Sequence, residues 1–500
     1  MSRRVQSVAV VGRDAPLWLT ALGLQRAFGR VGVQVTAVEL PTAMGEAEVY
    51  VATPTLSTLH QLLGIDEDDV LAACAGVYAL GQRWTGWSNT APPFMHAYDR
   101  FGAPFENVDF IHYWLRARAK GLPVALEEFS LGAAAAKQGR VIVHTHETES
   151  LSKAAHGYHL DARGYSAFLK GRALRAGVVG LRGPVEWAKV EGERVCSLDL
   201  PGGEAVAADL FVDVSAEGLL IDSLPGSGFE SWKRWLPCDR ILSISGRRMQ
   251  TLPSFSQISA LEVGWIGTFP LQDRTAFTAV YASNVASDQQ VLAGLTTAGL
   301  GLSGQASVTA FSAGARTRPW IGNCVAVGEA AVRLEPLDAA PMQLLQVALA
   351  HLVALFPVDA DNLLEASIYN REFRAYADNI RNFQLAHYKL NGRVGEPLWD
   401  RARGMEVPEG LAHKLKLFGA RGRVALYDNE TFDEATWISM FVGHGVAPRS
   451  YDPLADRVPD EDLPRKLQEL LDFIGEQING MPSVEAQLEI AMPSQGSGFF

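Results

Sequence analysis

The N-terminal segment of this 500-residue chain constrains its fold more than any other part. Residues 5–11 form an apolar run of strand length, residues 17–28 have apolar side chains at helical spacing, and residues 33–39 form a second strand-length run. A strand, a helix and a strand in close succession make a βαβ unit, whose crossover places the two strands parallel. The second strand ends in Glu39, an acid at the place where dinucleotide-binding folds contact the adenosine ribose. We therefore predict an α/β fold that begins with a Rossmann-like unit.

The rest of the chain mixes strands with helices and becomes mainly helical, and richer in charge, from about residue 360 onward. The last residues are rich in Ser and Gly, which is typical of a flexible tail. The predicted elements are strands at 141–146, 209–214 and 323–327, helices at 162–176 and 341–356, and a flexible tail at 492–500.

The composition excludes two classes of partner. The formal net charge of −12 at pH 7 opposes nucleic-acid binding, because phosphate binding needs a basic surface. There is no Lys- or Arg-rich run, and no apolar run approaches the roughly 20 residues of a membrane span. The apolar run at 8–11 is too short for the core of a signal peptide. We expect neither nucleic acid nor a membrane as a partner.

Neither the cysteines nor the histidines have metal-site spacing. The cysteines include no C-x-x-C pair, and no H-E-x-x-H motif occurs. Separated thiols are interpreted as buried cysteines in a reducing compartment, which predicts a cytoplasmic location and no metal site. The cysteines are Cys74, Cys196, Cys238 and Cys324.

The dinucleotide-binding fingerprint G-x-G-x-x-G is altered at residues 12–17, which read GRDAPL. Gly12 keeps its place. Asp14 stands at the second glycine, where it would bring a carboxylate towards the diphosphate, and bulky Leu17 stands at the third. The pattern leaves open whether the unit binds FAD weakly or not at all. Glu39 is either a ribose ligand or a solvated strand end.

Several separated segments together resemble the flavin-dependent tryptophan halogenase family. Their order along the chain follows that of the family, and no single one is decisive. The segments are MGEA at 44–47, TPTL at 53–56, HQLLGI at 60–65, YHLD at 158–161, ADLFVDVS at 208–215, LPCDR at 236–240, YASNVASD at 281–288, WIGNCVAVG at 320–328, LEPLD at 334–338, residues 383–388, Trp437, GHG at 443–445, Pro448 and MPS at 481–483.

The resemblance implies an FAD-binding Rossmann-like domain of the flavin monooxygenase and halogenase type, with a mainly helical C-terminal substrate-binding part. It implies an FAD-domain-like region over 1–359, with substrate-cap segments interleaved at approximately 41–150 and 230–310. The mainly helical region then covers 360–500. In this family Gly12, Glu39 and Gly328 would contact FAD. Glu329 stands where the family has a small or apolar residue.

The family's catalytic lysine, which presents the halogen to the substrate, falls at Ala79 in the segment AGVYALGQR at 75–83. A methyl group can neither carry charge nor donate a hydrogen bond. The first lysine of the chain is Lys120, so no neighbour replaces it by a small shift in register. Arg83 is the nearest cation and is interpreted as a surface or ion-pair arginine.

The family's halide site, Glu-Pro-Leu-Glu-Ser-Thr-Gly, is replaced by EPLDAAP at 335–341. Both hydroxyl groups are gone, and Pro341 has no N–H to donate. Asp338 keeps the carboxylate that accompanies the lysine in the family. It is either a general base, and thus the candidate catalytic residue, or a helix N-cap before Ala339.

The family's Trp-x-Trp-x-Ile-Pro segment, which separates flavin from substrate, reads WIGTFP at 265–270. Trp265 and Pro270 are the candidate walls of a substrate pocket, although a core tryptophan is the alternative. Gly267 replaces the second indole and is expected to open space. Such an opening would suit a monooxygenase whose flavin meets its substrate directly.

Three functional hypotheses follow from the resemblance: a flavin-dependent monooxygenase that no longer halogenates, a non-catalytic ligand-binding or partner protein, and a working halogenase. Three altered functional features argue against the third. Expected partners are a small aromatic or planar ligand, a flavin reductase or an active paralogue, and a second copy of the chain in a homodimer. The side chains that could stack on a planar ligand, or else pack in the core, are Trp84, Trp87, Phe94 and Trp114.

Overall fold

The computed structural model describes residues 3–142 and 155–491. The chain divides into two compact units, each assembled from three separate stretches. The predicted FAD-domain-like region over 1–359, with its interleaved cap segments, stays a prediction. Unit 1 comprises Met1–Ala75, Leu160–Ile244 and Gln305–Arg381, and unit 2 comprises Gly76–His159, Ser245–Gly304 and Asn382–Phe500.

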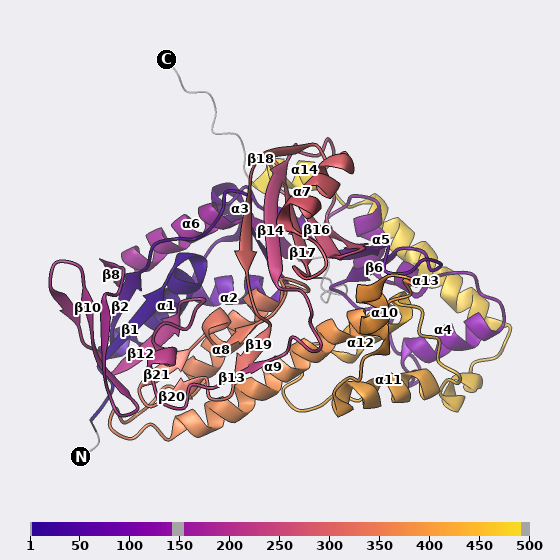
Figure 1. The fold of residues 1–500 in the computed structure, drawn as a ribbon. Coiled ribbons are helices and arrows are strands. Elements are labelled where there is room, and N and C mark those ends of the chain that lie inside the picture. The colour runs from indigo at the N-terminus through magenta and orange to yellow at the C-terminus, as the bar shows by residue number, and fades with distance from the viewer. Residues whose placement is uncertain (1–2, 143–154, 492–500) are drawn as a thin grey trace. The chain divides into compact units, whose positions relative to one another are not determined.

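The main sheet of unit 1 confirms the predicted α/β fold. Among the described residues its strand order is β20-β21-β12-β1-β2-β8, and β1 pairs in parallel with both β2 and β12 (Figure 1). The register pairs Gly12 with Glu39 on one side and with Val214 on the other, so three strands end at one edge of the sheet. The strands are β1 (Ser7–Gly12), β2 (Gln34–Glu39), β8 (Val179–Arg182), β12 (Leu210–Val214), β20 (Trp320–Ile321) and β21 (Cys324–Ala326).

The helices of unit 1 cover this sheet with apolar faces. Helix α1 buries Leu17, Trp18 and Leu22 and packs against α6 and α8 (Figure 1). Helix α6 begins after Asp161, whose side chain accepts a hydrogen bond from the N–H of Gly164 at 2.6 Å. The helices are α1 (Asp14–Phe28), α2 (Thr55–Leu63), α3 (Glu67–Ala73), α6 (Ala162–Arg175) and α8 (Ala340–Ala354), and α9 (Glu365–Lys389) begins in unit 1 and ends in unit 2.

Short strands complete unit 1. Strands β9 and β10 form a hairpin that β11 extends, and β19 pairs with β13 and β22. Their bounds are β3 (Val49–Ala52), β9 (Trp187–Glu191), β10 (Arg194–Leu200), β11 (Glu204–Val206), β13 (Phe229–Ser231), β19 (Gly314–Arg316) and β22 (Val332–Arg333).

Unit 2 contains a mainly antiparallel sheet. Strand β16 pairs with β15 and β17, and β5 joins β15 to β6. The chain passes between the units within β14 and β18, the strands at one side of this sheet. The strands are β4 (Val77–Ala79), β5 (Gly81–Thr85), β6 (Phe94–Ala97), β7 (Gly157–Asp161), β14 (Arg240–Gly246), β15 (Ser256–Leu261), β16 (Gly264–Pro270), β17 (Thr275–Tyr281) and β18 (Leu302–Ala310).

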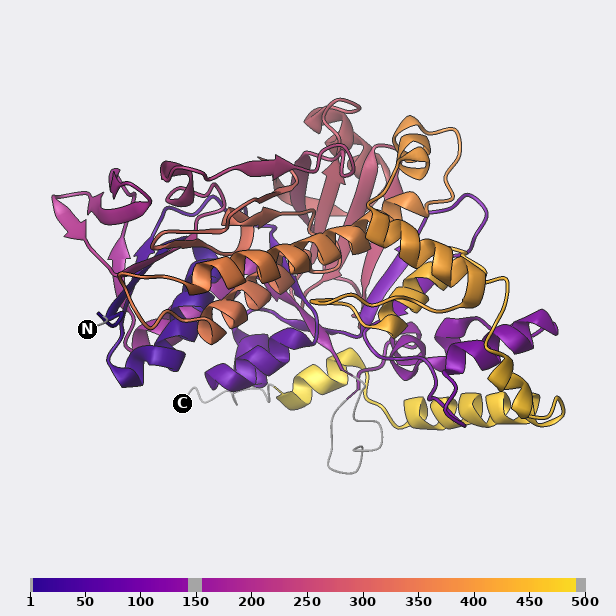
Figure 2. The ribbon, with the colours of Figure 1, turned by 90° about the horizontal axis from the view of Figure 1, so that it is seen from below.

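The C-terminal part of unit 2 is helical, as predicted. Helix α13 buries Leu463, Leu467, Ile474 and Ile478 on one face, and Ile474 and Ile478 pack with the alanines of α5. Figure 2 shows α13 beside α4. The helices are α4 (Phe110–Ala119), α5 (Leu131–Lys137), α7 (Asp288–Thr297), α10 (Pro397–Gly404), α11 (Glu409–Arg421), α12 (Glu434–Gly443), α13 (Asp462–Asn479) and α14 (Val484–Ala491).

The predicted elements at 5–11, 17–28, 33–39, 162–176 and 341–356 correspond to β1, α1, β2, α6 and α8, and those at 209–214 and 323–327 to β12 and β21. Most of the predicted strand at 141–146, and the whole predicted tail at 492–500, lie outside the described residues.

Two further expectations concern membranes and thiols. Across residues 3–142 and 155–491, no helix is both long enough and apolar enough to cross a membrane. Cys74, Cys238 and Cys324 are buried thiols, as predicted. Cys196 is only half-buried in β10, so the interpretation as a buried thiol is wrong for that residue.

Candidate functional site

A cavity of about 220 Å³ lies in unit 1 at the edge where β1, β12 and β21 end. The N-termini of α1 and α8 border it. Open parallel sheets bind their ligands at this edge, so it is the candidate site for a cofactor. Its apolar and aromatic lining includes Met44, Tyr50, Val214, Pro341, Met342 and Leu345.

Of the predicted FAD contacts, Gly12 is accounted for by strand packing and Gly328 lines the cavity. A Cβ on Gly12 would stand 2.5 Å from Cγ2 of Val214 and 2.7 Å from its carbonyl oxygen, so no larger residue fits between β1 and β12. Gly328 has a φ of +62°, which glycine adopts without strain. The first glycine of the fingerprint therefore survives for a structural reason.

Glu39, the third predicted contact, is held in an ion pair. It ends β2 at the same sheet edge, and its carboxylate accepts from Nζ of Lys170 at 2.5 Å. Lys170 also lies over the ring of Trp18, 5.3 Å from its centroid. A ribose hydroxyl would compete with this ion pair, and Glu39 does not line the cavity.

Three carboxyl groups from three chain segments line the cavity. Asp14 begins α1, Glu48 precedes β3, and Glu329 lies in the 3-10 turn η5 (Gly328–Ala330). Asp14 has a φ of +57°, so the backbone keeps a glycine-like conformation while carrying an acid. Glu48 accepts a hydrogen bond from the N–H of Gly45 at 2.8 Å. Asp14 and Glu329 were already identified from the sequence as acids at altered family positions, whereas Glu48 was not.

Burial raises the pKa of all three carboxyl groups above their ordinary range, because the surrounding protein penalises the charged form. The charges of Asp14 and Glu329 raise the pKa of Glu48 further. Burial also raises the pKa of the Tyr50 phenol, and the three carboxylates add to that increase. The side chain of Glu329 is exposed, so water screens its charge more than the charges of Asp14 and Glu48. Glu48 therefore interacts electrostatically with both of the other acids.

Among the described residues, Arg13 is the basic side chain in the cavity lining, and the protein already compensates its charge. Its Nη1 pairs with Glu217 at 2.6 Å, and its Nε donates to the carbonyl of Pro41 at 3.0 Å. Arg333, which lowers the pKa of Glu329, donates to the carbonyl of Glu217 at 2.8 Å. Both guanidinium groups are thus engaged by neighbouring protein atoms.

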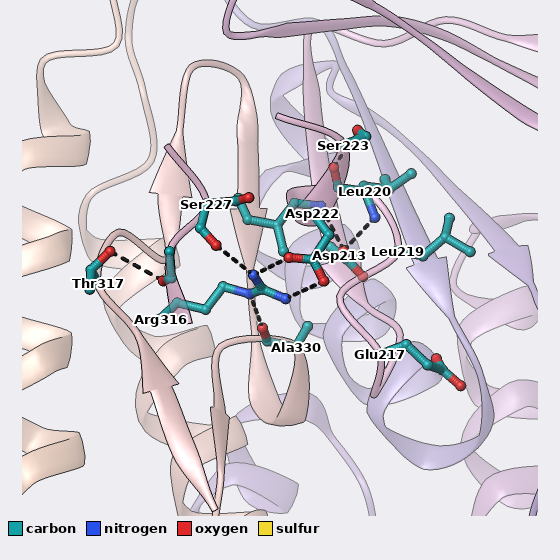
Figure 3. A network of polar contacts seen from close by, with 12 residues as sticks. Asp213, Glu217, Leu219, Leu220, Asp222, Ser223, Ser227, Arg316, Thr317 and Ala330 are labelled. Atoms are coloured by element: carbon teal, nitrogen blue, oxygen red, sulfur yellow. Dashed lines mark hydrogen bonds and ion pairs between the residues drawn. The ribbon is translucent and has the colours of Figure 1, made fainter. Parts of the chain in front are cut away.

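A buried arginine fixes the turn that carries Glu329. The side chain of Arg316 in β19 is 1% exposed, and its Nε donates to the carbonyl of Ala330 at 2.7 Å. Its Nη atoms bind the carboxylate of Asp222 and the carbonyl of Ser227 (Figure 3). The buried side chain of Arg316 therefore holds the turn that carries Glu329 in place.

Asp213 fixes the loop that follows β12 in the same network (Figure 3). Its carboxylate accepts from the N–H groups of Leu220 at 2.7 Å and Ile221 at 3.0 Å, and from the hydroxyl of Ser215 at 2.6 Å. This loop carries the cavity residue Ala216. Arg316 and Asp213 thus fix two segments that carry the cavity residues Glu329 and Ala216.

FAD, the cofactor implied by the resemblance, would present its diphosphate at this sheet edge. A diphosphate is normally held by the N–H groups of a helix N-terminus, whose dipole favours an anion. Here Asp14 brings its own carboxylate to the start of α1, and Glu48 and Glu329 line the same cavity. One compensated arginine does not balance three acids. The described residues of the cavity do not fit a diphosphate.

Ala79 ends β4, and its side chain is fully buried. It pairs with Gly157 of β7 in an antiparallel ladder. Arg83, the nearest cation along the chain, is exposed in β5, which confirms its interpretation as a surface arginine. The side chain at position 79, where the resemblance places the family's lysine, is a buried methyl group.

Asp338 precedes the start of α8 and is 5% exposed. The N-cap of α8 is Ala339, which has a φ of +55° and makes no side-chain cap hydrogen bond. The interpretation of Asp338 as the N-cap is therefore wrong, and its role as a general base stays a prediction. Pro341 lies in the first turn of α8 and removes one backbone donor from this helix start.

The expectation that Gly267 opens space is wrong. A Cβ on Gly267 would stand 2.4 Å from Cζ and 2.5 Å from Cε2 of Phe269, two residues along β16. The ring of Phe269 is itself buried and occupies the space that the second indole would need. Trp265 is fully buried, and both it and Pro270 are absent from the lining of the unit 1 cavity. Their assignment to a substrate pocket stays a prediction.

A second cavity, of about 300 Å³, lies within unit 2. Phe94 and Trp114 line it, together with Val442 of α12. Trp84 and Trp87, the other two candidates for stacking on a planar ligand, are buried outside its lining. In this cavity two aromatic side chains of unit 2 border open space.

Beside this cavity, two histidines far apart in the sequence meet in the core of unit 2. Nδ1 of His387 and Nε2 of His444 are 2.8 Å apart, and the ring of His387 stacks on Trp84 at a centroid distance of 3.8 Å. Burial lowers the pKa of both histidines well below the ordinary value. The described residues contain no group of three or more His, Cys, Asp or Glu side chains that could hold a metal ion.

Sequence reasoning missed Glu48, Tyr50 and the pairing of His387 with His444. No spacing rule connects these residues, because they meet only through the tertiary fold. The signal that could have indicated Glu48 and Tyr50 is their position just before and within the strand that follows the second strand, close in sequence to a sheet edge already predicted to bind a ligand.

The comparisons with known proteins all indicate the same family. The family described as tryptophan halogenase matches residues 7–460. BrvH, a flavin-dependent halogenase from Brevundimonas sp. BAL3, is 31% identical with a TM-score of 0.92, covering 98% of this chain and 99% of that one. Xcc4156, a flavin-dependent halogenase from Xanthomonas campestris, is 29% identical with a TM-score of 0.92, covering 98% of each chain.

A curated relative supports the same assignment. Tryptophan 6-halogenase ThaL from Streptomyces albogriseolus is 25% identical over 492 residues, which is 90% of this chain and 91% of the relative. The parallel sheet, the cavity at its edge and the matched residues 7–460 together show that this chain belongs to the tryptophan halogenase family.

Proposed function

We propose that this chain is a member of the flavin-dependent tryptophan halogenase family that does not transfer halogen, has lost tight FAD binding, and binds a small aromatic or planar ligand. The observation that carries this proposal is Ala79, a buried methyl group at the family's lysine position. An amine that can carry a halogen is missing there, and the chain has no lysine before Lys120 to replace it.

The start of α8 supports the same conclusion. Ala339 and Ala340 offer no hydroxyl, and Pro341 offers no N–H, where the family has hydroxyl and backbone donors for a halide. A halide ion that is removed from water needs several such donors to replace its hydration. Both the position of the lysine that would accept the halogen and the site that would bind the halide are altered.

The acids at the sheet edge support the loss of tight FAD binding. Asp14, Glu48 and Glu329 line the cavity where the family's cofactor would place its diphosphate. A flavin-dependent monooxygenase that no longer halogenates was the first hypothesis from the sequence, with the non-catalytic protein as its alternative, and the space expected at Gly267 favoured the monooxygenase. Because Phe269 fills that space, no observation now favours the monooxygenase.

The ligand is proposed from the aromatic lining of the unit 2 cavity, where Phe94 and Trp114 offer flat apolar surfaces. Relatives named for tryptophan halogenation make tryptophan and indole the natural first probes. A flavin reductase, an active paralogue, a homodimer and a cytoplasmic location stay predictions.

The test is an assay of halogen transfer with the full chain. Purified protein is incubated with FAD, a flavin reductase, NADH, chloride or bromide, and tryptophan or indole, and products are analysed by mass spectrometry. The tryptophan 6-halogenase of Streptomyces toxytricini, run in parallel, serves as the positive control. We expect no halogenated product and a colourless protein whose melting temperature rises with indole or tryptophan. A halogenated product above the heat-inactivated control would contradict the proposal.

A further inference from the structure

The acids of the unit 1 cavity differ from the other acids of the chain in one respect, because they converge on one cavity. Asp14 comes from the end of β1, Glu48 from the segment before β3, and Glu329 from the turn after β21. Three segments that are distant in sequence thus each supply one carboxylate to the same sheet edge.

On the basis of the proposed function, we infer that Asp14, Glu48 and Glu329 form an electrostatic barrier that keeps the diphosphate of FAD out of this cavity, and that neutralising them restores flavin binding. The loss of tight FAD binding is then due to three charges, while the fold that would hold the flavin remains intact.

Asp14 supplies the strongest part of this barrier. Its backbone φ of +57° is the conformation that a glycine would have at this position, so the helix start keeps the geometry of an anion site. Its carboxylate lies at the positive end of the α1 dipole and interacts with the hydroxyl of Thr42. The chain therefore places its own anion where a bound anion would otherwise lie.

Glu48 and Glu329 extend the barrier along the cavity. The charges of Glu329 and Asp14 both raise the pKa of Glu48. A diphosphate with about two negative charges would face all three. Neutralising one carboxylate should strengthen FAD binding on the order of tenfold, because interactions between unit charges a few ångströms apart have this size in a partly enclosed site.

The other charged groups that face these acids do not cancel them. They comprise Arg13, which is paired with Glu217, Arg333, which donates to backbone carbonyls, and Arg163, which is near Glu46. Glu39 and Glu217 add negative charge from the neighbouring loops. Burial raises the pKa of Asp14 and Glu48, so protonation of these acids as the pH falls should strengthen FAD binding.

The experiment measures FAD affinity by quenching of flavin fluorescence in the full-length protein. The variants are Asp14→Asn, Glu48→Gln and Glu329→Gln, singly and combined, since each amide keeps the size of the acid and removes its charge. We expect each single variant to bind FAD about tenfold more tightly at pH 8, and the triple variant to bind at least 100-fold more tightly and without the pH dependence. Circular dichroism checks folding, and the single variants keep the test valid if the triple variant does not fold.

Riboflavin separates charge from shape, because it has the same ring system and no phosphate. Its affinity should stay the same in all variants and at each pH at which FAD binding is measured. Glu204→Gln, which neutralises an exposed acid of unit 1 outside the cavity, is the control for overall charge and should leave FAD affinity unchanged. The inference is overturned if the triple variant binds FAD no better than the natural chain, or if riboflavin gains as much as FAD. It fails independently of the proposed function, since halogen transfer is measured separately.

Discussion

Replacing Arg316 by methionine should destabilise unit 1 by about 2–5 kcal/mol, because two backbone carbonyl groups lose their buried donor. The substitution removes the donors to the carbonyl groups of Ala330 and Ser227, and each carbonyl left buried without a partner costs about 1–3 kcal/mol. Asp222 contributes little, because its side chain is 55% exposed and water can solvate it again. Methionine recovers some apolar packing against Phe229, which offsets part of the loss.

Arg318→Met is the matched control, because Arg318 lies two residues further along the chain. Its ion pair with Glu193 has side-chain exposures of 44% and 49%, so its loss should cost less than about 1 kcal/mol. Urea unfolding should be followed by circular dichroism and by fluorescence, since a chain with two compact units need not unfold in one step. If both variants shift the unfolding midpoint equally, the reasoning that gives Arg316 a special structural role is refuted.

Three further predictions concern the lysine position, acid stability and the filled space in β16. Ala79→Lys alone should give no chlorinated product by mass spectrometry, because the halide site is still altered; chlorination would contradict our interpretation of that site. Burial lowers the pKa of His60 to about 4 and of His159 to about 3. Both histidines therefore stay neutral in the folded chain, whereas in the unfolded chain they take up protons below about pH 6.5. Stability should therefore fall with pH below that value, by about 4 kcal/mol at pH 5 for the two together, and a His159→Gln variant should lose about half of this dependence in urea titrations at pH 7.5 and pH 5. Gly267→Ala should cost about 1–3 kcal/mol in thermal unfolding, because the new methyl group meets the ring of Phe269, and Phe269→Ala should relieve this clash in the double variant; additive losses would show that the ring does not fill that space.

The sequence predicted the elements of unit 1 well because their signals are local. The apolar runs that became β1, β2 and β12 have strand length, and the spacing over α1 has a helical period. The replaced functional residues were also local, since Ala79 and Asp14 could be read directly from short segments. The family followed from the order of many such segments along the chain.

The errors came from features that local patterns do not contain. The ring of Phe269 fills the space at Gly267 because side chains two residues apart lie on the same face of a strand, a consequence of strand geometry and not of composition. Asp338 was expected as a possible cap, but the helix begins one residue later than that interpretation needs. Glu48 joins the acidic cavity only because the fold returns its segment to the sheet edge.

The alternation of the two units along the chain limits how this protein can be divided. The polypeptide crosses from one unit to the other five times, so any single cut leaves at least one unit without a stretch it needs. Shortened genes would yield fragments with exposed cores and a tendency to aggregate, and a nick in a loop would leave pieces that stay associated until denaturant is added. Expression trials should therefore use the undivided chain. Evolutionary change in such a chain is expected to proceed by point substitution rather than by loss or exchange of modules.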